Sequence, residues 1–223
     1  EVKPDIILSV PLILEKIYKK MIAPQISKAP VSWVLKVPYL DEIVLGKIRE
    51  HLINAFGGRF SQIIIGGAPL NAEVEAFLHR IKFPLTVGYG MTETAPLISF
   101  TKWEQFRPGS CGQVLEGLME AKIDKPDADG IGEIMVRGEN VMYGYYKNDE
   151  ATRLAITEDG WLHTGDLGMI DSDNFIYIKG RSKTMLLGPS GQNIYPEEIE
   201  AKLNNMPYVM ESLVLQRGTQ LVA

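Results

Sequence analysis

Thr92 and Glu93 are the side chains of this 223-residue sequence best suited to chemistry on a charged ligand. They end the stretch YGMTE at residues 89–93. A threonine hydroxyl can donate to a phosphate oxygen, and a carboxylate can hold Mg²⁺, which takes oxygen ligands and keeps several waters. Helix capping by Thr92 and a solvated surface position for Glu93 are the alternatives for each residue alone. Within this stretch we favour phosphate and metal binding.

Asp166 and Arg181 are the second pair of candidate ligand-binding residues. Asp166 ends the stretch WLHTGD just after a predicted strand, and Arg181 follows a strand predicted over 175–179. An ionised carboxylate can accept hydrogen bonds from two neighbouring hydroxyls, which suits a ribose. Arg181 can bind the same ribose or a phosphate. Each also has an ordinary interpretation when taken alone, as a turn aspartate beside glycine and as a surface arginine.

Two loops rich in small residues can bring the backbone close to a flat ring. Each follows a short apolar strand, and open α/β sheets bind ligands beyond the carboxyl ends of their strands. The small residues are Gly67, Ala68 and Pro69 in the first loop and Gly88 and Gly90 in the second. Glycines permit close approach, so a nucleotide base can lie between the first loop and the ring of Tyr89. A tight turn and a core aromatic are the alternatives.

Composition argues against several other classes of protein. The net charge of −5 gives no broad basic surface for nucleic acid. Cys111 is the single cysteine, so no internal disulfide forms, which fits a reducing, cytoplasmic setting. The sequence has no Cys/His cluster for zinc, no GxxxxGK[ST] loop and no GxGxxG stretch. No apolar run is long enough to cross a membrane.

Strands and helices alternate over residues 1–105, which predicts an α/β layer built on a parallel sheet. The predicted strands cover 6–10, 63–65 and 85–87, and the predicted helices cover 11–22, 44–56 and 71–81. The continuous apolar runs of these strands are typical of strands buried in a sheet. Asn71 is a favoured N-cap. Prolines between residues 24 and 38 predict loop, with a short helix near Trp33.

Short strands separated by turn residues dominate residues 106–180, which predicts a small antiparallel β-barrel subdomain. The predicted strands cover 113–115, 119–123, 132–136, 161–163, 168–170 and 175–179, with one helix over 148–156. The last region, 184–223, begins a small α+β domain. It has a helix that starts at Pro196 with acidic residues in its first turn, where the helix dipole favours them. A strand over 210–215 precedes a turn whose partner strand we expect to be missing.

The order and spacing of the motifs resemble the adenylate-forming, or AMP-binding, superfamily, and long-chain acyl-CoA synthetases in particular. The motifs are GGAP at 66–69, YGMTE at 89–93, TGD at 164–166 and GRSK at 180–183. The stretches ILSVP at 7–11 and GGR at 57–59 are also similar to that subgroup, so the resemblance covers essentially the whole chain. It implies ATP, Mg²⁺ and CoA as cofactor and co-substrates, and a fatty acid as the substrate.

The resemblance implies a role for each motif residue. The residues that bind ATP or AMP would be Gly67, Ala68, Pro69, Tyr89, Gly90, Thr92, Asp166 and Arg181. The first three and the tyrosine would flank adenine, and the aspartate and arginine would bind ribose. Thr92 would act on the phosphate, and Glu93 would hold magnesium. Gly88 would border the acyl pocket, and Lys183 would be the pivot of a hinge at 181–183.

The implied reaction has two steps, in which a carboxylate attacks ATP to give an acyl-adenylate and CoA then takes the acyl group. The family's phosphate loop ending in PKG and its C-terminal catalytic lysine are absent from this sequence. We therefore expect an excerpt of a longer enzyme that is inactive alone. The alternatives are an aryl-CoA ligase, an acyl-carrier-protein loader, a non-catalytic nucleotide-binding module or a scaffold. The motifs leave open the acyl chain, the oligomeric state and any peripheral membrane contact.

Overall fold

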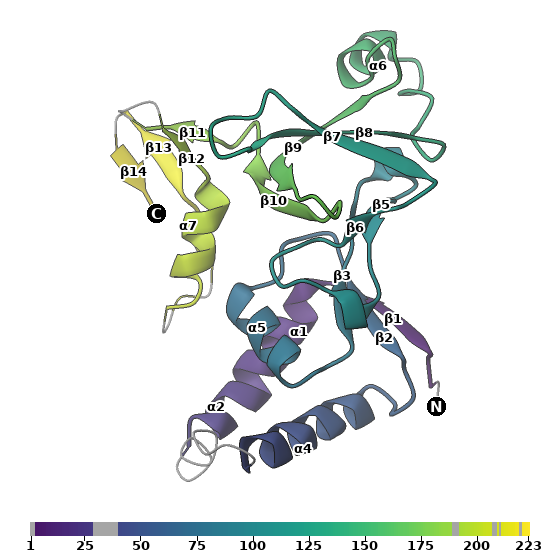
Figure 1. Cartoon of the computed structure of the whole chain (residues 1–223). Helices are drawn as coiled ribbons and strands as arrows, with labels where there is room; N and C mark the ends of the chain where they lie inside the picture. The colour runs from purple at the N-terminus through teal and green to yellow at the C-terminus, as the bar shows by residue number, and fades with distance from the viewer. Residues whose placement is uncertain (1–2, 29–39, 189–191, 207–208, 210, 219) are drawn as a thin grey trace. The chain divides into compact units, whose positions relative to one another are not determined.

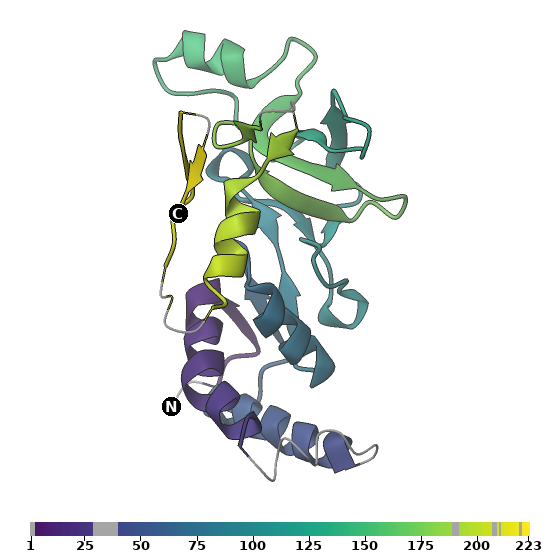
Figure 2. The same ribbon diagram turned by 90° about the vertical axis from the view of Figure 1, so that its left-hand side faces the viewer.

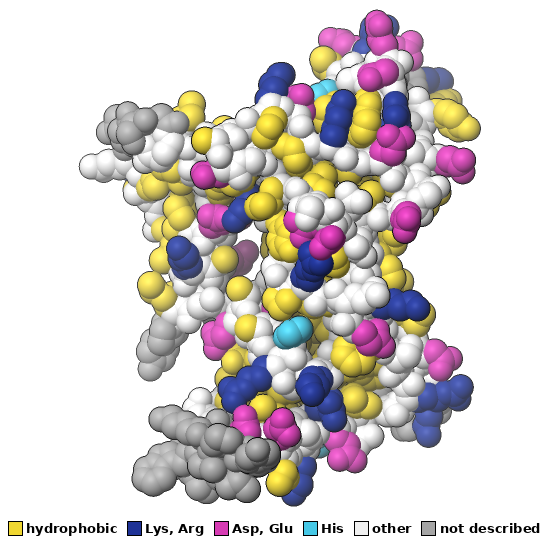
Figure 3. Space-filling model, in the orientation of Figure 1, with side chains coloured by type: hydrophobic (Ala, Val, Ile, Leu, Met, Phe, Trp, Pro, Cys, Tyr) yellow, Lys and Arg dark blue, Asp and Glu magenta, His cyan; other side chains and the backbone are white. Residues whose placement is uncertain are grey.

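The structure is a computed structural model with two compact units (Figure 1). It describes residues 3–28, 40–188, 192–206, 209, 211–218 and 220–223. The first unit comprises Glu1–Tyr89 and Thr101–Gly109, and the second comprises Gly90–Phe100 and Ser110–Ala223. No helix among the described residues is both long and apolar enough to span a bilayer. On the face shown in Figure 3, basic and acidic side chains are interspersed.

A parallel three-stranded sheet forms the centre of the first unit. Its strands are β1 (Ile6–Ser9), β2 (Gln62–Ile65) and β3 (Leu85–Val87), in the order β1-β2-β3. The predicted parallel α/β layer is confirmed. The expectation that the first strand is buried is wrong, because Ile6 is 57% and Leu8 78% exposed. The two edge strands differ: β1 is exposed along half of its residues, whereas β3 at the other edge is buried like the central strand β2.

The first helix runs further than predicted. The helices of this unit are α1 (Pro11–Ile17), the π-helical η1 (Tyr18–Ile22), α2 (Ala23–Ile26), α4 (Leu40–Ala55) and α5 (Ala72–Arg80). Pro24 does not end the helix, because it stands at the start of α2, where a proline costs no intrahelical hydrogen bond. Asn71 is confirmed as an N-cap, since its side chain accepts from the backbone N–H groups of Glu73 and Val74. The predicted helix near Trp33 lies outside the described residues.

Helix α5 packs against α1 and η1 to close the core of the first unit (Figure 2). The Tyr18 hydroxyl donates to Glu73 over 3.0 Å, and the rings of Tyr18 and Phe77 lie 5.1 Å apart. Fully buried aliphatic side chains of the sheet and of α5 complete this core, among them Ile63, Ile65, Val74 and Leu78. The packing fixes the ends of β2 and β3, from which the two small-residue loops leave.

Antiparallel sheets build the second unit, but they do not close into a barrel among the described residues. The larger sheet has the order β10-β9-β8-β7, with β7 (Met119–Asp124), β8 (Gly132–Gly138), β9 (Leu162–Ile170) and β10 (Ile176–Arg181). The smaller sheet joins β4 (Tyr89–Gly90), β5 (Leu97–Phe100) and β6 (Gln113–Val114). The predicted β-barrel is therefore replaced by open sheets. Helix α6 (Asp149–Ala155) lies in the connection from β8 to β9 and is capped by Asn148.

Two predictions about strands of the second unit are wrong. The strands predicted over 161–163 and 168–170 are one strand, β9, which pairs with β8 on both sides of the Thr-Gly-Asp stretch, where the register shifts, and with β10 as far as Asp166. The strand before the final turn is β13 (Leu215–Arg217) rather than residues 210–215, and it does have a partner, since it pairs with β14 (Gln220–Val222). The remaining elements of this region are β11 (Leu186–Leu187), β12 (Asn193–Ile194) and α7 (Pro196–Leu203).

Candidate nucleotide-binding site

The two small-residue loops leave adjacent strands at the same edge of the parallel sheet, as predicted. Ile65 at the end of β2 pairs with Val87 at the end of β3. The Gly88 N–H donates to the Ile65 carbonyl over 2.8 Å, and a methyl group on Gly66 would lie 3.3 Å from the Gly88 carbonyl oxygen. A side chain at position 66 would therefore crowd the neighbouring loop. This edge is where open α/β sheets accept ligands.

The exposed part of this pair of loops is the turn over 67–69. Gly67, Ala68 and Pro69 are exposed, and Gly67 has φ +83°, a conformation that favours glycine. Gly88 and Tyr89 are buried, the tyrosine at 8% exposure. A flat ring can therefore lie on the 67–69 turn, whereas the Tyr89 ring offers it only a small exposed part.

Gly90 has a structural reason to be glycine. A methyl group at this position would overlap the carbonyl of Pro96, where the chain returns towards β5. We predicted that Gly90 lets a ligand approach the backbone. The structure adds a second reason for glycine here, which is the close approach of the Pro96 carbonyl. The residue itself is exposed.

Thr92 and Glu93 lie together in a short 3₁₀ helix, η2 (Thr92–Thr94). Thr92 is exposed and Glu93 is partly buried. The Tyr145 hydroxyl donates to Oε1 of Glu93 over 2.8 Å, and the Met142 backbone N–H donates to the Glu93 carbonyl over 2.8 Å. The bond to Glu93, followed by burial, raises the pKa of Tyr145, so its hydroxyl remains a donor at neutral pH. The sequence analysis missed Tyr145, because nothing in the spacing from 93 to 145 indicates this contact.

Glu93 fits the way in which Mg²⁺ binds together with a nucleotide. Such sites use one or two carboxylates plus substrate phosphates rather than a cage made by the protein alone. Among the described residues, no group of three or more His, Cys, Asp or Glu side chains could hold a metal by itself. The Glu93 carboxylate has about four lone-pair positions, of which the Tyr145 hydroxyl uses one. Oxygen capacity for a metal therefore remains.

Asp166 and Arg181 are brought together by the pairing of β9 with β10. They are cross-strand partners, and Nε of Arg181 lies 3.1 Å from Oδ1 of Asp166. The Asp166 side chain is 8% exposed and that of Arg181 is 73% exposed. Contrary to prediction, Asp166 lies inside a strand and Arg181 ends one. The pair offers a charged acceptor and a charged donor side by side, as recognition of a hydroxyl-bearing ligand requires.

Glu133 on β8 supports the Thr-Gly-Asp stretch from the neighbouring strand. Its Oε1 accepts from the Gly165 N–H over 3.0 Å, and its Oε2 lies 2.9 Å from Nδ1 of His163. Thr164 donates its hydroxyl to the Ile134 carbonyl over 2.7 Å and accepts from the Asp166 N–H over 3.1 Å. These bonds hold the backbone at Asp166 and at the residues just before it. Sequence reasoning missed Glu133, because strand register is needed to place it there.

The predicted hinge residue Lys183 is exposed and lies in a turn. The Ser182 N–H donates to the Gly165 carbonyl over 2.9 Å, which links the turn to the Thr-Gly-Asp stretch. The Thr184 hydroxyl donates to Oε1 of Glu197 over 2.6 Å, which links it to α7. Among the described atoms, Oε2 of Glu197 is buried without a hydrogen-bond partner. The turn that follows β10 is therefore linked to α7 by the Thr184 side chain.

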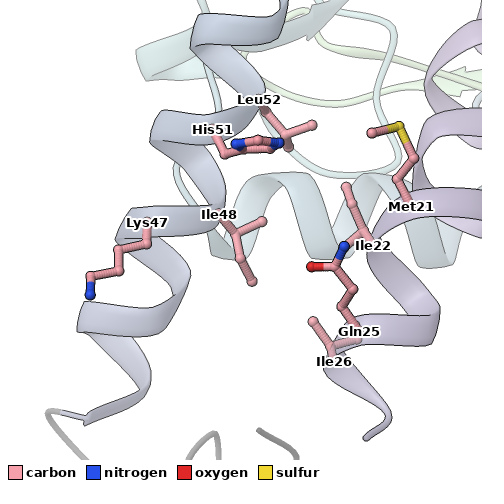
Figure 4. Close-up of a pocket in the computed structure, with 8 residues that line it drawn as sticks. All are labelled: Met21, Ile22, Gln25, Ile26, Lys47, Ile48, His51 and Leu52. Atoms are coloured by element: carbon pink, nitrogen blue, oxygen red, sulfur yellow. The ribbon is translucent and has the colours of Figure 1, made fainter.

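A separate pocket of about 240 Å³ lies in the first unit between the helix η1–α2 and α4 (Figure 4). Its lining is mostly apolar, and its three polar side chains are Gln25, Lys47 and His51. The other lining residues are Met21, Ile22, Ile26, Ile48 and Leu52. None of the predicted site residues lines it. The structure thus groups the predicted residues in three places: the 67–69 turn with residues 88–89, the Glu93–Tyr145 contact, and the Asp166–Arg181 pair. Their convergence on one nucleotide stays a prediction.

Comparison with known proteins is consistent with these motifs. The family model described as "AMP-binding enzyme" matches residues 1–146. The long-chain-fatty-acid–CoA ligase ACSBG2 of Gallus gallus is 34% identical over 221 residues, which cover 90% of this chain and 29% of that protein. The chain thus spans less than a third of that relative's length.

Solved structures at 28% identity agree in fold. ATP-bound MatB from Rhodopseudomonas palustris has a TM-score of 0.70, covering 96% of this chain and 38% of that chain. O-succinylbenzoate CoA synthetase (MenE) from Bacillus subtilis, in complex with ATP and magnesium, has a TM-score of 0.68, covering 95% of this chain and 38% of that chain.

Proposed function

Because this chain belongs to the AMP-binding enzyme family, we propose that it is part of an ATP-dependent acyl-CoA ligase that activates a long-chain fatty acid. The acid's carboxylate attacks the α-phosphorus of ATP, pyrophosphate leaves, and an acyl-adenylate forms. The thiol of CoA then attacks the acyl carbon, and AMP leaves. Binding and orientation of the reactants supply much of the rate in such reactions.

The observation that carries the proposal is the pairing of Asp166 with Arg181. These residues come from two separate motifs, and the β9–β10 register brings them within 3.1 Å of each other. We assign ribose binding to the Asp166 carboxylate, with the exposed Arg181 guanidinium beside it. The bonds of Glu133 and Thr164 hold the backbone that carries this acceptor before the ligand arrives, which favours electrostatic preorganisation.

The other motif residues take the remaining parts of the nucleotide. We assign the adenine to the exposed turn of Gly67, Ala68 and Pro69, with Tyr89 and Gly90 on the adjoining loop and Gly88 bordering the acyl group. Thr92 would donate to a phosphate oxygen. Glu93 would hold Mg²⁺, which offsets phosphate charge when bound. Lys183 would be the hinge residue, since it lies in the turn that follows β10, and the next residue, Thr184, is hydrogen-bonded to Glu197 of α7.

The long-chain substrate rests on the sequence relatives, and the solved structures keep an alternative open. ACSBG2 is named as a long-chain-fatty-acid ligase, whereas MenE is named for the aromatic acid o-succinylbenzoate. An aryl-CoA ligase is therefore the second candidate. A panel of palmitate, benzoate and o-succinylbenzoate separates the two, because only an acid that is adenylated supports exchange of pyrophosphate into ATP.

The experiment is pyrophosphate–ATP exchange by the complete protein that contains this chain, followed by CoA-dependent release of AMP. We expect exchange with palmitate and Mg²⁺, and AMP release once CoA is added. Residues 1–223 alone should show neither reaction, because they contain no phosphate loop and no C-terminal catalytic lysine. Nucleotide binding by the complete protein without exchange for any acid would instead identify a non-catalytic module and reject the proposal.

A further inference from the structure

The Glu93 carboxylate has a specific partner outside its own motif. The hydroxyl of Tyr145, 52 residues further along, donates to Oε1 of Glu93 over 2.8 Å. Tyr145 is 39% exposed, so the hydroxyl end of this contact lies near the surface. A carboxylate at the end of a flexible glutamate side chain loses rotamer freedom when it is held in this way. The contact therefore selects one orientation of the carboxylate that the proposed function assigns to magnesium.

The backbone around Tyr145 is fixed by the start of helix α6. The Tyr145 N–H donates to the Thr152 hydroxyl over 2.9 Å, and that hydroxyl donates to the Asn148 carbonyl over 2.9 Å. Gly144 has φ +152°, and a methyl group there would lie 2.7 Å from the Thr152 methyl carbon. Gly144 and the start of α6 therefore fix the backbone at Tyr145. From this backbone the Tyr145 side chain reaches Glu93.

The contact is not needed to hold this segment in place. The Asn140 amide donates to the carbonyls of Thr94 and Leu97 over 2.6 and 2.8 Å, and the Met142 N–H donates to the Glu93 carbonyl. These bonds already join the segment to the backbone around η2. Of these groups, the Tyr145 hydroxyl is the one that bonds to the Glu93 carboxylate. It therefore acts on the orientation of the Glu93 carboxylate.

We propose that Tyr145 is a positioning residue: its hydroxyl fixes the Glu93 carboxylate so that the remaining lone pairs face the magnesium–nucleotide complex. This inference rests on the proposed function, because it takes Glu93 as the metal ligand. Partners that hold a metal ligand from outside typically change metal affinity by roughly 10- to 100-fold when they are removed. Tyr145 touches neither the metal nor the substrate in this role.

The test compares two chemically identical changes in the complete protein. Tyr145→Phe removes the hydroxyl that donates to Glu93, whereas Tyr146→Phe removes a hydroxyl from a side chain that is 89% exposed. The probes are Mn²⁺ with α,β-methylene-ATP, followed by the electron paramagnetic resonance signal of bound Mn²⁺, and the same nucleotide in EDTA, followed by calorimetry. Thermal unfolding of each variant reports the fold.

We expect Tyr145→Phe to weaken binding of the Mn²⁺–nucleotide about 10-fold while leaving metal-free nucleotide binding and the thermal midpoint close to wild type. Tyr146→Phe should match the wild type in all three. In a Glu93→Gln background, Tyr145→Phe should add no further loss. Equal loss of metal-bound and metal-free binding, or no loss in either, overturns the inference. An additive loss in the double variant does the same.

The result also separates this inference from the proposed function. If the wild-type protein binds neither the Mn²⁺–nucleotide nor the metal-free nucleotide, the proposed function fails, and the positioning role fails with it. If the wild type binds both and the two tyrosine variants behave alike, the function stands and the role of Tyr145 alone is rejected.

Discussion

At the scale of residues, the most informative side chains are those whose partners come from another strand or loop. Asp166 is almost buried, yet its charge partner Arg181 is mostly exposed, so the pair lies at the surface with one member held firmly. Glu93 is similar in being held by Tyr145. A charged acceptor fixed in this way is ready for a ligand donor, whereas an exposed, mobile carboxylate would first lose rotamer freedom.

Asp166→Asn tests the ribose assignment. The substitution keeps the shape but removes the charge, and the guanidinium that loses its partner is exposed and hydrated. We expect the free energy of unfolding to fall by about 1 kcal/mol, the typical net value of one hydrogen bond. The affinity for AMP should fall about 10-fold or more, since hydrogen bonds to charged groups contribute roughly 1.5–3 kcal/mol. Calorimetric titration with AMP and denaturant unfolding measure the two quantities.

The matched control for Asp166→Asn is Glu120→Gln. Glu120 pairs with Arg137 across β7 and β8 at 2.9 Å, and both side chains are exposed. This substitution also removes a carboxylate charge from a cross-strand ion pair, but no motif contains either residue. AMP affinity should remain at the wild-type level. A ribose role for Asp166 is ruled out if Asp166→Asn also leaves the AMP affinity unchanged.

At the scale of elements, α5 combines a good N-cap with an acidic residue on its buried face. Glu75 is 7% exposed, and the Gly109 backbone N–H donates to its carboxylate. Burial raises the pKa of Glu75 above its ordinary value of 4.5, and the hydrogen bond from Gly109 opposes this only in part. The folded chain therefore binds a proton at this residue more tightly than the unfolded chain does.

The sign of this shift predicts a pH dependence. The pKa of Glu75 is higher in the folded chain than in the unfolded chain. Glu75 therefore destabilises the fold most once the pH exceeds its pKa in the folded chain, because the buried carboxyl group must then ionise. Glu75→Gln should therefore raise the thermal midpoint at neutral pH. The gain should shrink as the pH falls towards 4.5, where both states become protonated. A thermal midpoint measured from pH 4 to 8 checks this, with Glu42→Gln on the exposed surface of α4 as the control substitution. A gain that is independent of pH would contradict the account.

At the scale of the whole molecule, local patterns predicted most elements, and long-range pairing explains the failures. The local sequence shows a strand at Ile63–Ile65, a helix capped by Asn71 and a second strand at Leu85–Val87. This strand–helix–strand order was enough to predict the parallel sheet. The continuity of β9 depends on β8 and β10, which no single segment of sequence specifies. The same holds for the open sheets that replace the expected barrel.

The candidate site also contains some residues that the sequence predicted and others that it did not. Motif spacing supplied the candidate ligand-binding residues, because glycines, hydroxyls and carboxylates are informative by type. It did not predict Glu133 or Tyr145, whose contacts span 32 and 52 residues and follow from register and loop packing. The residues proposed to act on a ligand were therefore visible in the sequence, whereas the residues that hold them in place required the structure.

The most direct test is an experimental structure of the complete protein with AMP bound. We expect an oxygen of the Asp166 carboxylate at hydrogen-bond distance, about 3 Å, from a ribose hydroxyl. The adenine should lie against the turn of Gly67, Ala68 and Pro69 and beside Tyr89. An AMP molecule that contacts neither Asp166 nor this turn would rule out the proposed nucleotide site.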